Sequence, residues 1–318
     1  MLRLDYHLSP TLQHNLQNIE AVRVKILTTA LSPKHELRFK WETKLLKIYS
    51  SLCLSGSDIS KKQIIGILSS GEKKKANREE SEIIRYRNCL DHIRNDWMAS
   101  GKNIGTNDVK NLYDVALVPV GSFNPSLFNT KEKDLKKILD YVQSSKENPI
   151  IQAGIVQIQI HTLQPFKEGN GIVSRLLTDL ILYKNGYDVR ELIAPEIEMY
   201  NRQKSHDIAI DLCIKEDSMS KWLDYFVYIT LLQLKNVATD ITESKFLTDS
   251  KNSNFNLNSR QKKILLFLEA PNSKLANKDV QKMFSVSQIT ASRDLSHLAG
   301  LGLLIGYGKA RSKVYMKS

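Results

Sequence analysis

The sequence predicts a mostly α-helical protein that ends in a small α+β domain. Apolar residues recur at helical spacing along most of the 318 residues, and one such segment begins at a clear capping signal, Ser32 followed by Pro33. Three short helical patterns and two short strands come after a polar stretch at residues 246–258. The length allows about two domains and a sizeable core.

The first half of the chain contains three predicted helices and one ambiguous segment. The helix that begins after Ser32 extends to about residue 48, and residues 78–93 have a similar pattern. Residues 134–142 form a short helix whose Lys-rich face we interpret as solvated surface. Residues 113–125 contain β-type residues and turn signals, which are typical of a short hairpin or a loop.

The most informative motif lies at residues 161–175, His-Thr-Leu-Gln-Pro-Phe-Lys-Glu-Gly-Asn-Gly-Ile-Val-Ser-Arg. Its Gly-Asn-Gly turn leads directly into an apolar helical pattern, and backbone N–H groups at such a helix start converge on an anion, most often a phosphate. Glu168, beside the turn, is a candidate Mg²⁺ ligand. Arg175, on the first turn of the helix, is a candidate phosphate clamp.

This motif resembles that of the Fic family of protein AMP-transferases, His-x-Phe-x-(Asp/Glu)-Gly-Asn-Gly-x-x-x-Arg, which has a further Arg directly after the second Gly. Residues 153–163 also have the length and apolar pattern of the helix that delivers the catalytic loop in that family. The resemblance implies a helical Fic core that uses ATP and Mg²⁺. It also implies nucleotide-binding roles for the matching residues Phe166, Gly169, Asn170, Gly171 and Arg175.

Two positions depart from the family motif. Gln164 stands where the family has the His that takes a proton from the target hydroxyl, and Ile172 stands where it has the first Arg. A carboxamide has no basic site near neutral pH, and loss of a positioned general base costs about 10²–10⁴ in rate. Loss of a phosphate-binding Arg removes a charge-assisted hydrogen bond worth roughly 1.5–3 kcal/mol. We therefore expect residual transferase activity at best.

His161 has two interpretations. It lies three residues before Gln164, on the same helical face, and so is a candidate substitute base. The plainer interpretation is a partly buried helix residue. The family position is usually acidic and points into the structure, which favours the plainer interpretation.

Two further comparisons with the family concern regulation and target binding. Many Fic proteins carry an inhibitory helix, (Ser/Thr)-x-x-x-Glu-(Gly/Asn), whose Glu pairs with the second motif Arg. The segment Ser51-Leu-Cys-Leu-Ser-Gly56 places Ser55 at the Glu position, although Gly56 is also an ordinary helix stop. In the family the region of residues 113–125 forms a hairpin flap that pairs with the target's backbone. In this sequence the segment is short, so it is either a reduced flap or a loop.

Most of the positive charge lies at the C-terminal end of the chain. Residues 251–318 contain 12 Lys and Arg but only three acidic residues, Glu269, Asp279 and Asp294, which accounts for +9 of the net charge of +12. Such an asymmetry indicates a polyanionic partner.

The order of elements in the C-terminal segment is typical of a winged helix-turn-helix. Ser259 is the predicted cap of a helix at residues 260–269, a second helix covers 277–284, and Ser287 caps a third at 288–301. Two short strands around a basic, Gly-containing tip follow at 303–315. The third helix would be the recognition helix, and the tip would be the wing.

Double-stranded DNA is the partner that this arrangement predicts. On the recognition helix, base edges or phosphates would meet Ser287, Gln288, Thr290 and Arg293, and the wing would hold the DNA backbone through Lys309, Arg311 and Lys313. The alternative is a winged helix used for protein contacts or dimerisation, with its charge serving solubility.

Composition narrows the class of protein. Apolar content of 42% and charged content of 25% are ordinary for a globular protein, the N-terminus has no signal-like apolar stretch, and the longest apolar run, residues 225–234, is too short to span a bilayer. The three cysteines are scattered without metal-ligand spacing. These features predict a cytoplasmic protein, and because Fic cores and winged-helix regulators often dimerise, we expect a homodimer.

The sequence therefore predicts a helical segment at residues 1–100, a Fic domain at 101–245, a linker at 246–258 and a winged helix at 259–318. Our leading hypothesis is a degenerate Fic protein that binds a nucleotide or phosphate and acts as a DNA-binding regulator. Two alternatives stay open. One is an active protein adenylyltransferase with a non-standard base, whose protein target the sequence does not name, and the other is a structural scaffold with an empty pocket.

Overall fold

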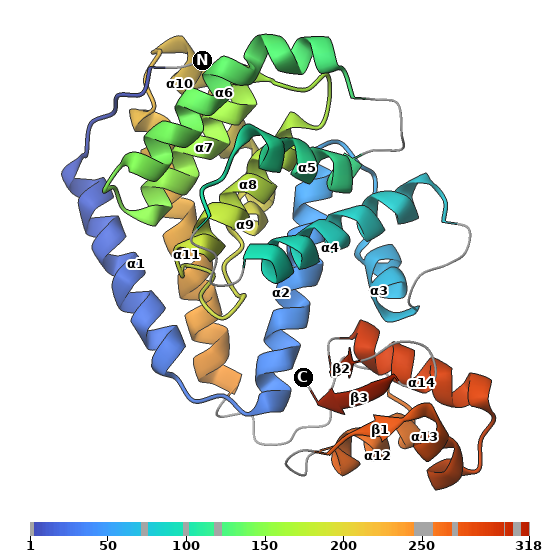
Figure 1. Ribbon diagram of the computed structural model, residues 1–318. Coiled ribbons are helices and arrows are strands. Elements are labelled where there is room, and N and C mark those ends of the chain that lie inside the picture. The colour runs from blue at the N-terminus through green and yellow to red at the C-terminus, as the bar shows by residue number, and fades with distance from the viewer. Residues whose placement is uncertain are drawn as a thin grey trace.

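Helix α7 (Pro149–Leu163) is the centre of the larger part of the molecule (Figure 1). The computed structural model describes residues 3–70, 76–97, 102–117, 123–244, 257–268, 273–301, 303–307 and 313–317. Within these residues the chain forms fourteen helices and one three-stranded sheet. Nearly all of α7 is buried, since it carries apolar residues on every side, and its contacts are with α6 (Pro125–Ser144), α8 (Asn170–Lys184) and α11 (Ser220–Ser244).

A close helix crossing fixes α7 against α11. A Cβ added at Gly154 would lie 2.9 Å from side-chain atoms of Leu223 and Phe226, so only glycine fits at this contact. The Gly154 carbonyl accepts a hydrogen bond of 2.8 Å from the indole N–H of Trp222. The helix that carries the candidate site is therefore held rigidly in the core.

The remaining helices of this part cover the central group. Helix α1 packs along α11, α2 against α9, and α4 against both α5 and α8. Their bounds are α1 Pro10–Thr28, α2 Pro33–Leu54, α3 Lys61–Ser70, α4 Arg78–Trp97, α5 Thr106–Leu117, α9 Pro195–Asn201 and α10 Gln203–Lys215.

The helix signals in the sequence were largely correct. Ser32 caps α2 by accepting a hydrogen bond from the His35 N–H, with Pro33 in the first turn, although α2 continues six residues beyond the predicted end at 48. The predicted helix at 78–93 is the first part of α4, which continues to Trp97, and the predicted helix at 134–142 lies within α6. The helix stop is also confirmed, because Gly56 follows the end of α2 with φ of 87°.

The expectation of β structure at residues 113–125 is wrong for its first five residues. They form the last turns of α5, because Val109, Leu112, Tyr113 and Ala116 are buried on one helical face. That stripe outweighs the local β propensity of the valines. Residues 118–122, where a flap would lie, are outside the described residues, and α6 begins at Pro125.

The C-terminal part has its own hydrophobic core. Helices α12 (Ser259–Phe267), α13 (Asn277–Phe284) and α14 (Gln288–Gly300) enclose a cluster that includes Ile264, Val280 and Leu295. The strands β1 (Leu275–Ala276), β2 (Leu304–Tyr307) and β3 (Val314–Lys317) pair antiparallel in the order β1-β3-β2. We call residues 257–317, as far as they are described, the C-terminal unit.

Two details of this unit differ from the sequence prediction. Asn258, not Ser259, caps α12, because Asn258 and Gln261 form a reciprocal capping box. Strand β1 was not predicted, and it pairs Leu275 with Tyr315 and Ala276 with Val314. The helix at 277–284 and the cap at Ser287, which accepts from the Thr290 N–H, are confirmed.

The C-terminal unit packs on helices α2 and α3 (Figure 1). Leu37 and Trp41 of α2 contact its hydrophobic cluster. His297 of α14 is hydrogen-bonded through Nδ1 to the Ser69 carbonyl of α3 at 3.0 Å. The two cores therefore share an interface at one end of α2.

Two predictions from composition can be compared with the structure. Among the described residues, no helix combines the length and apolar character needed to cross a membrane. All three cysteines are free and lie in helices, with Cys89 and Cys213 buried and Cys53 half-buried.

Candidate functional site

The loop between α7 and α8 is built by residues that end one helix and start the next. Gln164 caps α7 in the left-handed conformation, with φ of 48°, and its N–H bonds the Ile160 carbonyl. Gly169 has φ of 76° directly before α8, and a Cβ there would lie 2.1 Å from a methyl group of Leu117. Glycine is therefore required at 169 both by its backbone conformation and by the contact with α5.

Asn170 braces this loop from within. Its carboxamide oxygen accepts from the Phe166 N–H at 3.0 Å, and its amide group donates to the Phe166 carbonyl at 2.7 Å. The paired bonds close the loop over residues 166–170 directly before α8. Unpaired N–H groups at a helix start favour an anion.

Phe166 anchors the loop in an aromatic cluster. Its side chain is only 4% exposed and stacks on Tyr113 with ring centroids 4.1 Å apart and an interplanar angle of 6°. Phe123 and Phe128 complete the cluster. A ring as buried as that of Phe166 positions the loop by packing, and the nucleotide-binding role expected of this residue stays a prediction.

Gln164 and Ile172, the two residues expected to depart from the family motif, lie in different environments. Gln164 and Glu168 are exposed in the loop, where a ligand could reach them. Ile172, in contrast, is 7% exposed and belongs to the main hydrophobic core. Its apolar side chain stabilises the helix packing.

Arg175 is buried beneath the turn and is held by the end of α2. Its Nε donates to the Ser51 hydroxyl at 2.7 Å, and its Nη2 donates to the Ser51 carbonyl at 2.8 Å and to the Ser55 hydroxyl at 2.6 Å. Nη1 lies 3.4 Å from the position that a Cβ on Gly171 would take. One end of the guanidinium is therefore fixed by α2, and the other faces the start of α8.

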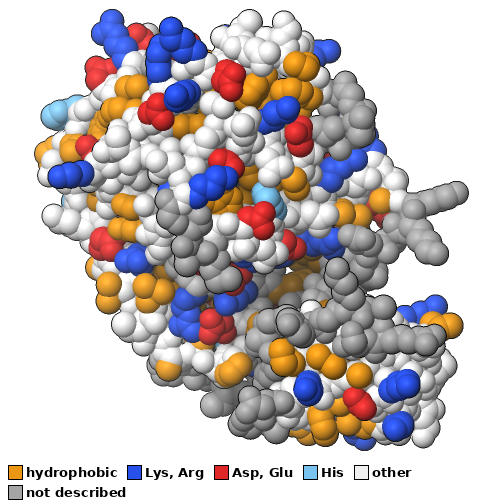
Figure 2. Space-filling view, viewed as in Figure 1, with side chains coloured by type: hydrophobic (Ala, Val, Ile, Leu, Met, Phe, Trp, Pro, Cys, Tyr) orange, Lys and Arg blue, Asp and Glu red, His pale blue; other side chains and the backbone are white. Residues whose placement is uncertain are grey.

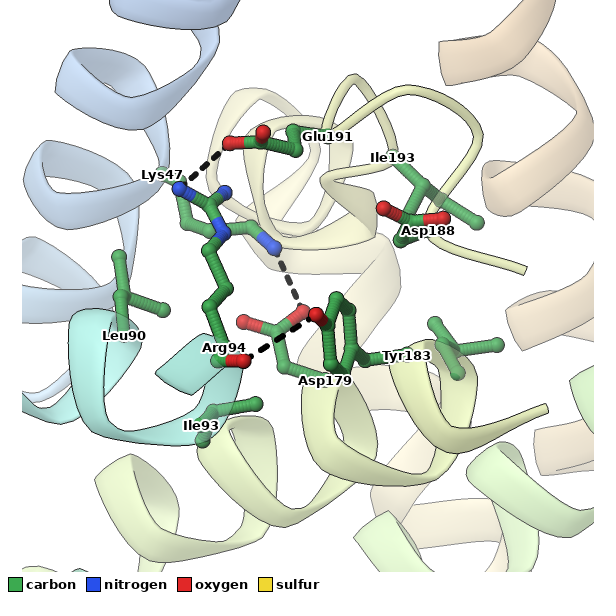
Figure 3. A pocket seen from close by; sticks show the side chains of 10 residues that line it. Lys47, Leu90, Ile93, Arg94, Asp179, Tyr183, Asp188, Glu191 and Ile193 are labelled. Atoms are coloured by element: carbon green, nitrogen blue, oxygen red, sulfur yellow. Dashed lines mark hydrogen bonds and ion pairs between the residues drawn. The ribbon is translucent and has the colours of Figure 1, made fainter. Parts of the chain in front are cut away.

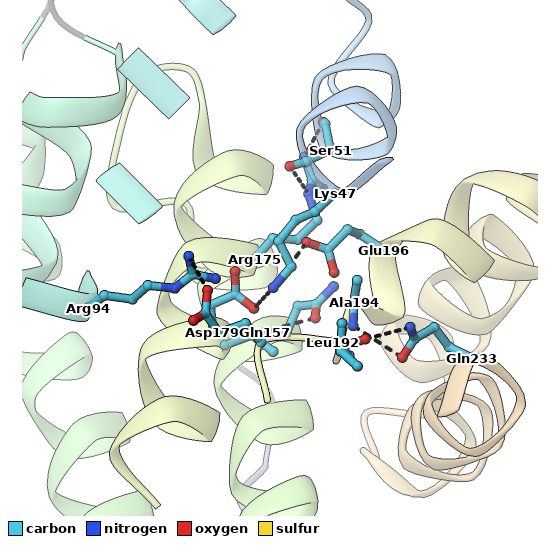
Figure 4. A network of polar contacts seen from close by, with 12 residues as sticks. Lys47, Ser51, Arg94, Gln157, Arg175, Asp179, Leu192, Ala194, Glu196 and Gln233 are labelled. Atoms are coloured by element: carbon cyan, nitrogen blue, oxygen red, sulfur yellow. Dashed lines mark hydrogen bonds and ion pairs between the residues drawn. The ribbon is translucent and has the colours of Figure 1, made fainter. Parts of the chain in front are cut away.

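A network of charged side chains continues from Arg175 into the core (Figure 4). Lys47, four residues before Ser51, is hydrogen-bonded to Asp179 at 2.5 Å, and Glu196 lies 3.9 Å away on α9. Asp179 follows Arg175 by four residues, so both lie on one face of α8. Helices α2 and α8 therefore bring their basic and acidic groups into one row. We call this row of residues the polar seam: Lys47, Ser51, Ser55, Arg175, Asp179 and Glu196.

Glu196 is the least satisfied member of the polar seam. It is 3% exposed, and its Oε1 has no hydrogen-bond partner. Burial raises the pKa of Glu196 to about 7, and Lys47 counteracts only part of that increase. A carboxyl group that titrates near neutral pH therefore lies within the network that holds Arg175.

A cavity lies beside the polar seam, and Figure 3 shows the side chains that line it. It has a volume of about 30 Å³ and is lined by Lys47, Asp179, Arg94 and Glu191, among others. Arg94 pairs with Glu191 at 2.5 Å, which closes one side. The cavity can hold a water molecule or two but not a nucleotide.

His161 lies on the other side of Arg175. It is half-buried and lines a cavity of about 10 Å³ together with Arg175, His206 and Trp222. Burial lowers the pKa of His161, and the charge of Arg175 lowers it further. The side chain is directed toward α8 and α10, as expected for a partly buried helix residue.

The predicted DNA-contacting residues are gathered on one unit. Ser287, Gln288 and Arg293 are exposed along α14, whereas Thr290 is half-buried and contacts the Ser287 hydroxyl at 3.0 Å. Lys313 is exposed beside β3, with its Nζ 5.1 Å from the ring centroid of Tyr315. Lys309 and Arg311 lie outside the described residues.

Comparison with known proteins identifies one part of the chain. Residues 102–182 match the model of the Fic/DOC family. The chain is 26% identical over 171 residues to a protein adenylyltransferase fic-1 of Caenorhabditis elegans, an alignment that covers 47% of this chain and 34% of that protein. The corresponding Caenorhabditis briggsae protein is 25% identical over the same length. The chain thus spans about a third of the curated relatives that it matches.

Solved structures extend the similarity in fold. A Fic family protein from Desulfovibrio desulfuricans G20 matches with a TM-score of 0.64 and 13% identity, over 98% of this chain and 97% of that one. A Fic-domain signaling protein from Bacteroides thetaiotaomicron matches with a TM-score of 0.58 and 15% identity, over 76% of this chain and 100% of the other. The family match, the loop and the shared fold agree: the chain contains a Fic/DOC domain.

Proposed function

We propose that the loop at residues 164–175 binds the phosphates of a nucleotide and that the protein transfers AMP at most slowly. The observation that carries this proposal is the double hydrogen bond of Asn170 to the backbone of Phe166, which preorganises the start of α8. A preformed turn pays little ordering cost when an anion binds. Arg175 adds a permanent positive charge directly below the turn.

Magnesium fits the same place. Mg²⁺ is usually held by one or two carboxylates together with substrate phosphates. Glu168 is an exposed carboxylate one residue before Gly169, beside the N-terminus of α8 where the phosphates would lie. Glu168 would hold the ion, which would offset the negative charge of the phosphates.

We expect AMP transfer to be slow because the transfer to a hydroxyl requires a base. A target hydroxyl oxygen would form a bond to the α-phosphorus, the bond from that phosphorus to pyrophosphate would break, and the hydroxyl proton would have to leave. The Gln164 amide can orient a hydroxyl but cannot accept the proton. His161 is half-buried toward α8 and α10, so it does not replace the missing base.

An active adenylyltransferase is the alternative, because the curated relatives carry that name and the loop is complete apart from Gln164 and Ile172. Intact mass after incubation with Mg-ATP separates the two, using the native protein, Gln164→His, and Gln164→His with Ile172→Arg. An AMP adduct on the native protein would establish an active enzyme. An adduct only on the restored variants would support a nucleotide site without its base.

The single variant is needed because Ile172 is a core residue. An Arg at 172 could destabilise the fold, so the double variant is informative only if its thermal unfolding matches that of the native protein. Calorimetric titration with Mg-ATP measures binding without chemistry. If the native protein neither binds ATP nor acquires an adduct, the proposal fails and the scaffold alternative gains support.

We further infer that the C-terminal unit is a winged helix-turn-helix that binds duplex DNA. Its element order supports this, with α14 in the place of a recognition helix and with the antiparallel strands β2 and β3 at the C-terminal end. Figure 2 shows Lys and Arg side chains on its exposed face, at the lower right. Of the chain's net charge of +12, residues 251–318 account for +9.

The salt dependence of binding tests the DNA proposal. Each DNA phosphate that the protein neutralises contributes about −0.9 to the slope of log K against log salt concentration. We expect Lys313→Gln to weaken binding to all duplexes and to reduce that slope by about one. Undetectable or salt-independent binding would contradict the proposal. Light scattering on the same samples would check the predicted homodimer.

A further inference from the structure

The C-terminal unit is in close contact with α3 through the end of α14. A Cβ added at Gly300 would lie 2.7 Å from the carbonyl oxygen of Leu68, so the two backbones meet with no room for a side chain. One turn earlier His297 bonds to the Ser69 carbonyl at 3.0 Å. Leu37 and Trp41 of α2 pack against the C-terminal cluster beside this contact.

This contact lies at the C-terminal end of α14, beside the face that would read DNA. The exposed residues Gln288, Ser292, Arg293 and Ser296 follow one another along that face at helical spacing. Ser69 lines the same cavity, of about 490 Å³, as Ser292, Arg293, Ser296 and His297. The end of α3 therefore borders the third and fourth turns of the recognition face.

The dimensions of DNA make the two contacts incompatible. The major groove of B-DNA is about 12 Å wide. One helix with its side chains has a diameter of about 10–12 Å and fills that width. The groove therefore has no room for α3 beside any part of α14 that enters it.

We propose that docking of α14 on α3 inhibits DNA binding, so that the C-terminal unit must leave the Fic-containing part before α14 can enter the major groove. The proposal rests on the DNA-binding function proposed above. The docking contacts include the apolar side chains of Leu37 and Trp41 and the hydrogen bond between His297 and the Ser69 carbonyl.

Two substitutions open the interface from opposite sides. Gly300→Ala introduces a methyl group against the Leu68 carbonyl, and Leu37→Ala removes an apolar contact on α2 that does not belong to the DNA-binding unit. Gly66→Ala is the matched control, because Gly66 is also helical, lies on α3, and has nothing within 4 Å of an added Cβ.

Fluorescence anisotropy of a labelled duplex with the full chain measures the effect. Both interface variants should bind about fivefold or more tightly, since binding is weakened in proportion to the fraction that is docked, and Gly66→Ala should bind like the native protein. Hydrogen exchange of residues 61–70 should increase in both interface variants. It should also increase in the native protein when the duplex is added.

Two outcomes would overturn the proposal in distinguishable ways. If the interface variants show increased exchange in α3 but bind DNA with native affinity, docking does not inhibit and only this inference fails. If no protein, native or variant, binds the duplex, the proposed DNA-binding function fails as well.

Discussion

Arg175 of α8 donates a hydrogen bond of 2.6 Å to the hydroxyl of Ser55, at the end of α2. Arg175 is 6% exposed, whereas Ser55 is exposed, so the hydroxyl lies at the mouth of the site and the guanidinium below it. The family resemblance places an inhibitory Glu at position 55. A neutral hydroxyl occupies Nη2 without neutralising its charge, which leaves that charge available to a phosphate.

Ser55→Glu should therefore weaken nucleotide binding. A carboxylate opposite Arg175 would form a charge-assisted pair and compete with the phosphate, at a cost of about 1.5–3 kcal/mol, or about tenfold or more in Kd. Ser55→Gln adds nearly the same volume without the charge. We expect Ser55→Gln to bind Mg-ATP within a few-fold of the native protein in calorimetric titration. Equal weakening by both substitutions would show that bulk, rather than charge, controls the site.

Gly169→Ala should destabilise the protein by more than the strain of the left-handed backbone at this position alone. The left-handed φ of 76° costs roughly 1–2 kcal/mol for Ala, and the contact with Leu117 at 2.1 Å adds overpacking of about 1–3 kcal/mol. Gly186→Ala is the matched control, because Gly186 has a similar φ of 71° and no atom within 4 Å of an added Cβ.

Thermal unfolding separates the two contributions. Gly186→Ala should lower the Tm slightly, and Gly169→Ala should lower it clearly more and reduce ATP affinity. If the two variants lose the same stability, Leu117 yields easily and the loop is less rigid than its packing indicates.

The loop could be predicted because its signals are local. Gly169 and Asn170 stand directly before and at the start of α8, so turn chemistry in the sequence predicts the helix start. The same holds for Ser32 and Ser287 as helix caps. The cap at Gln164 was not predicted. Residues 113–117 were predicted wrongly, because their β-type composition is local whereas the burial of Tyr113 and Ala116 depends on packing against the rest of the core.

The polar seam was missed because its members are far apart in sequence. Lys47 and Asp179 are separated by 132 residues. In the sequence alone, each has the pattern of an ordinary charged residue on the surface of a helix. A signal did exist: Lys47, Ser51 and Ser55 recur every four residues on α2, as Arg175 and Asp179 do on α8. Two such polar rows on otherwise buried helices indicate a pairing, but only the fold shows which rows meet.

The pH dependence of stability should report on Glu196. Its pKa is about 7 in the folded protein, against 4.5 as the ordinary value, so between these pH values the folded state holds a proton that the unfolded state releases. Stability from this group is present below pH 4.5 and is lost as pH increases toward 7. The loss should be on the order of 2–3 kcal/mol.

Glu196→Gln should remove that loss, because an amide does not titrate. Denaturant unfolding from pH 5 to 8 should show a decrease in stability for the native protein that is smaller in Glu196→Gln. Glu191→Gln is a useful control, since Glu191 is a partly exposed ion-pair partner for which a smaller effect is expected. Parallel profiles for the native protein and Glu196→Gln would exclude Glu196 as the titrating group.

Asp294 should be essential for the C-terminal unit although it faces away from DNA. It is 4% exposed and accepts hydrogen bonds from Asn258 at 3.0 Å, Arg260 at 2.9 Å and Gln261 at 2.9 Å, which tie α12 to α14. Asp294→Ala leaves these donors without their acceptor and should cost about 3–5 kcal/mol. We expect an early unfolding transition of the C-terminal unit in calorimetry and loss of DNA binding, with ATP binding retained.

Asp279→Ala separates this structural role from electrostatics. It changes the net charge of the unit by the same +1, but Asp279 caps the Ala276 N–H at an exposed site, where a lost cap costs about 1 kcal/mol. The extra positive charge should then leave DNA affinity unchanged or slightly increased. If Asp279→Ala weakens DNA binding as much as Asp294→Ala does, the hydrogen bonds of Asp294 are not what holds α14 in place.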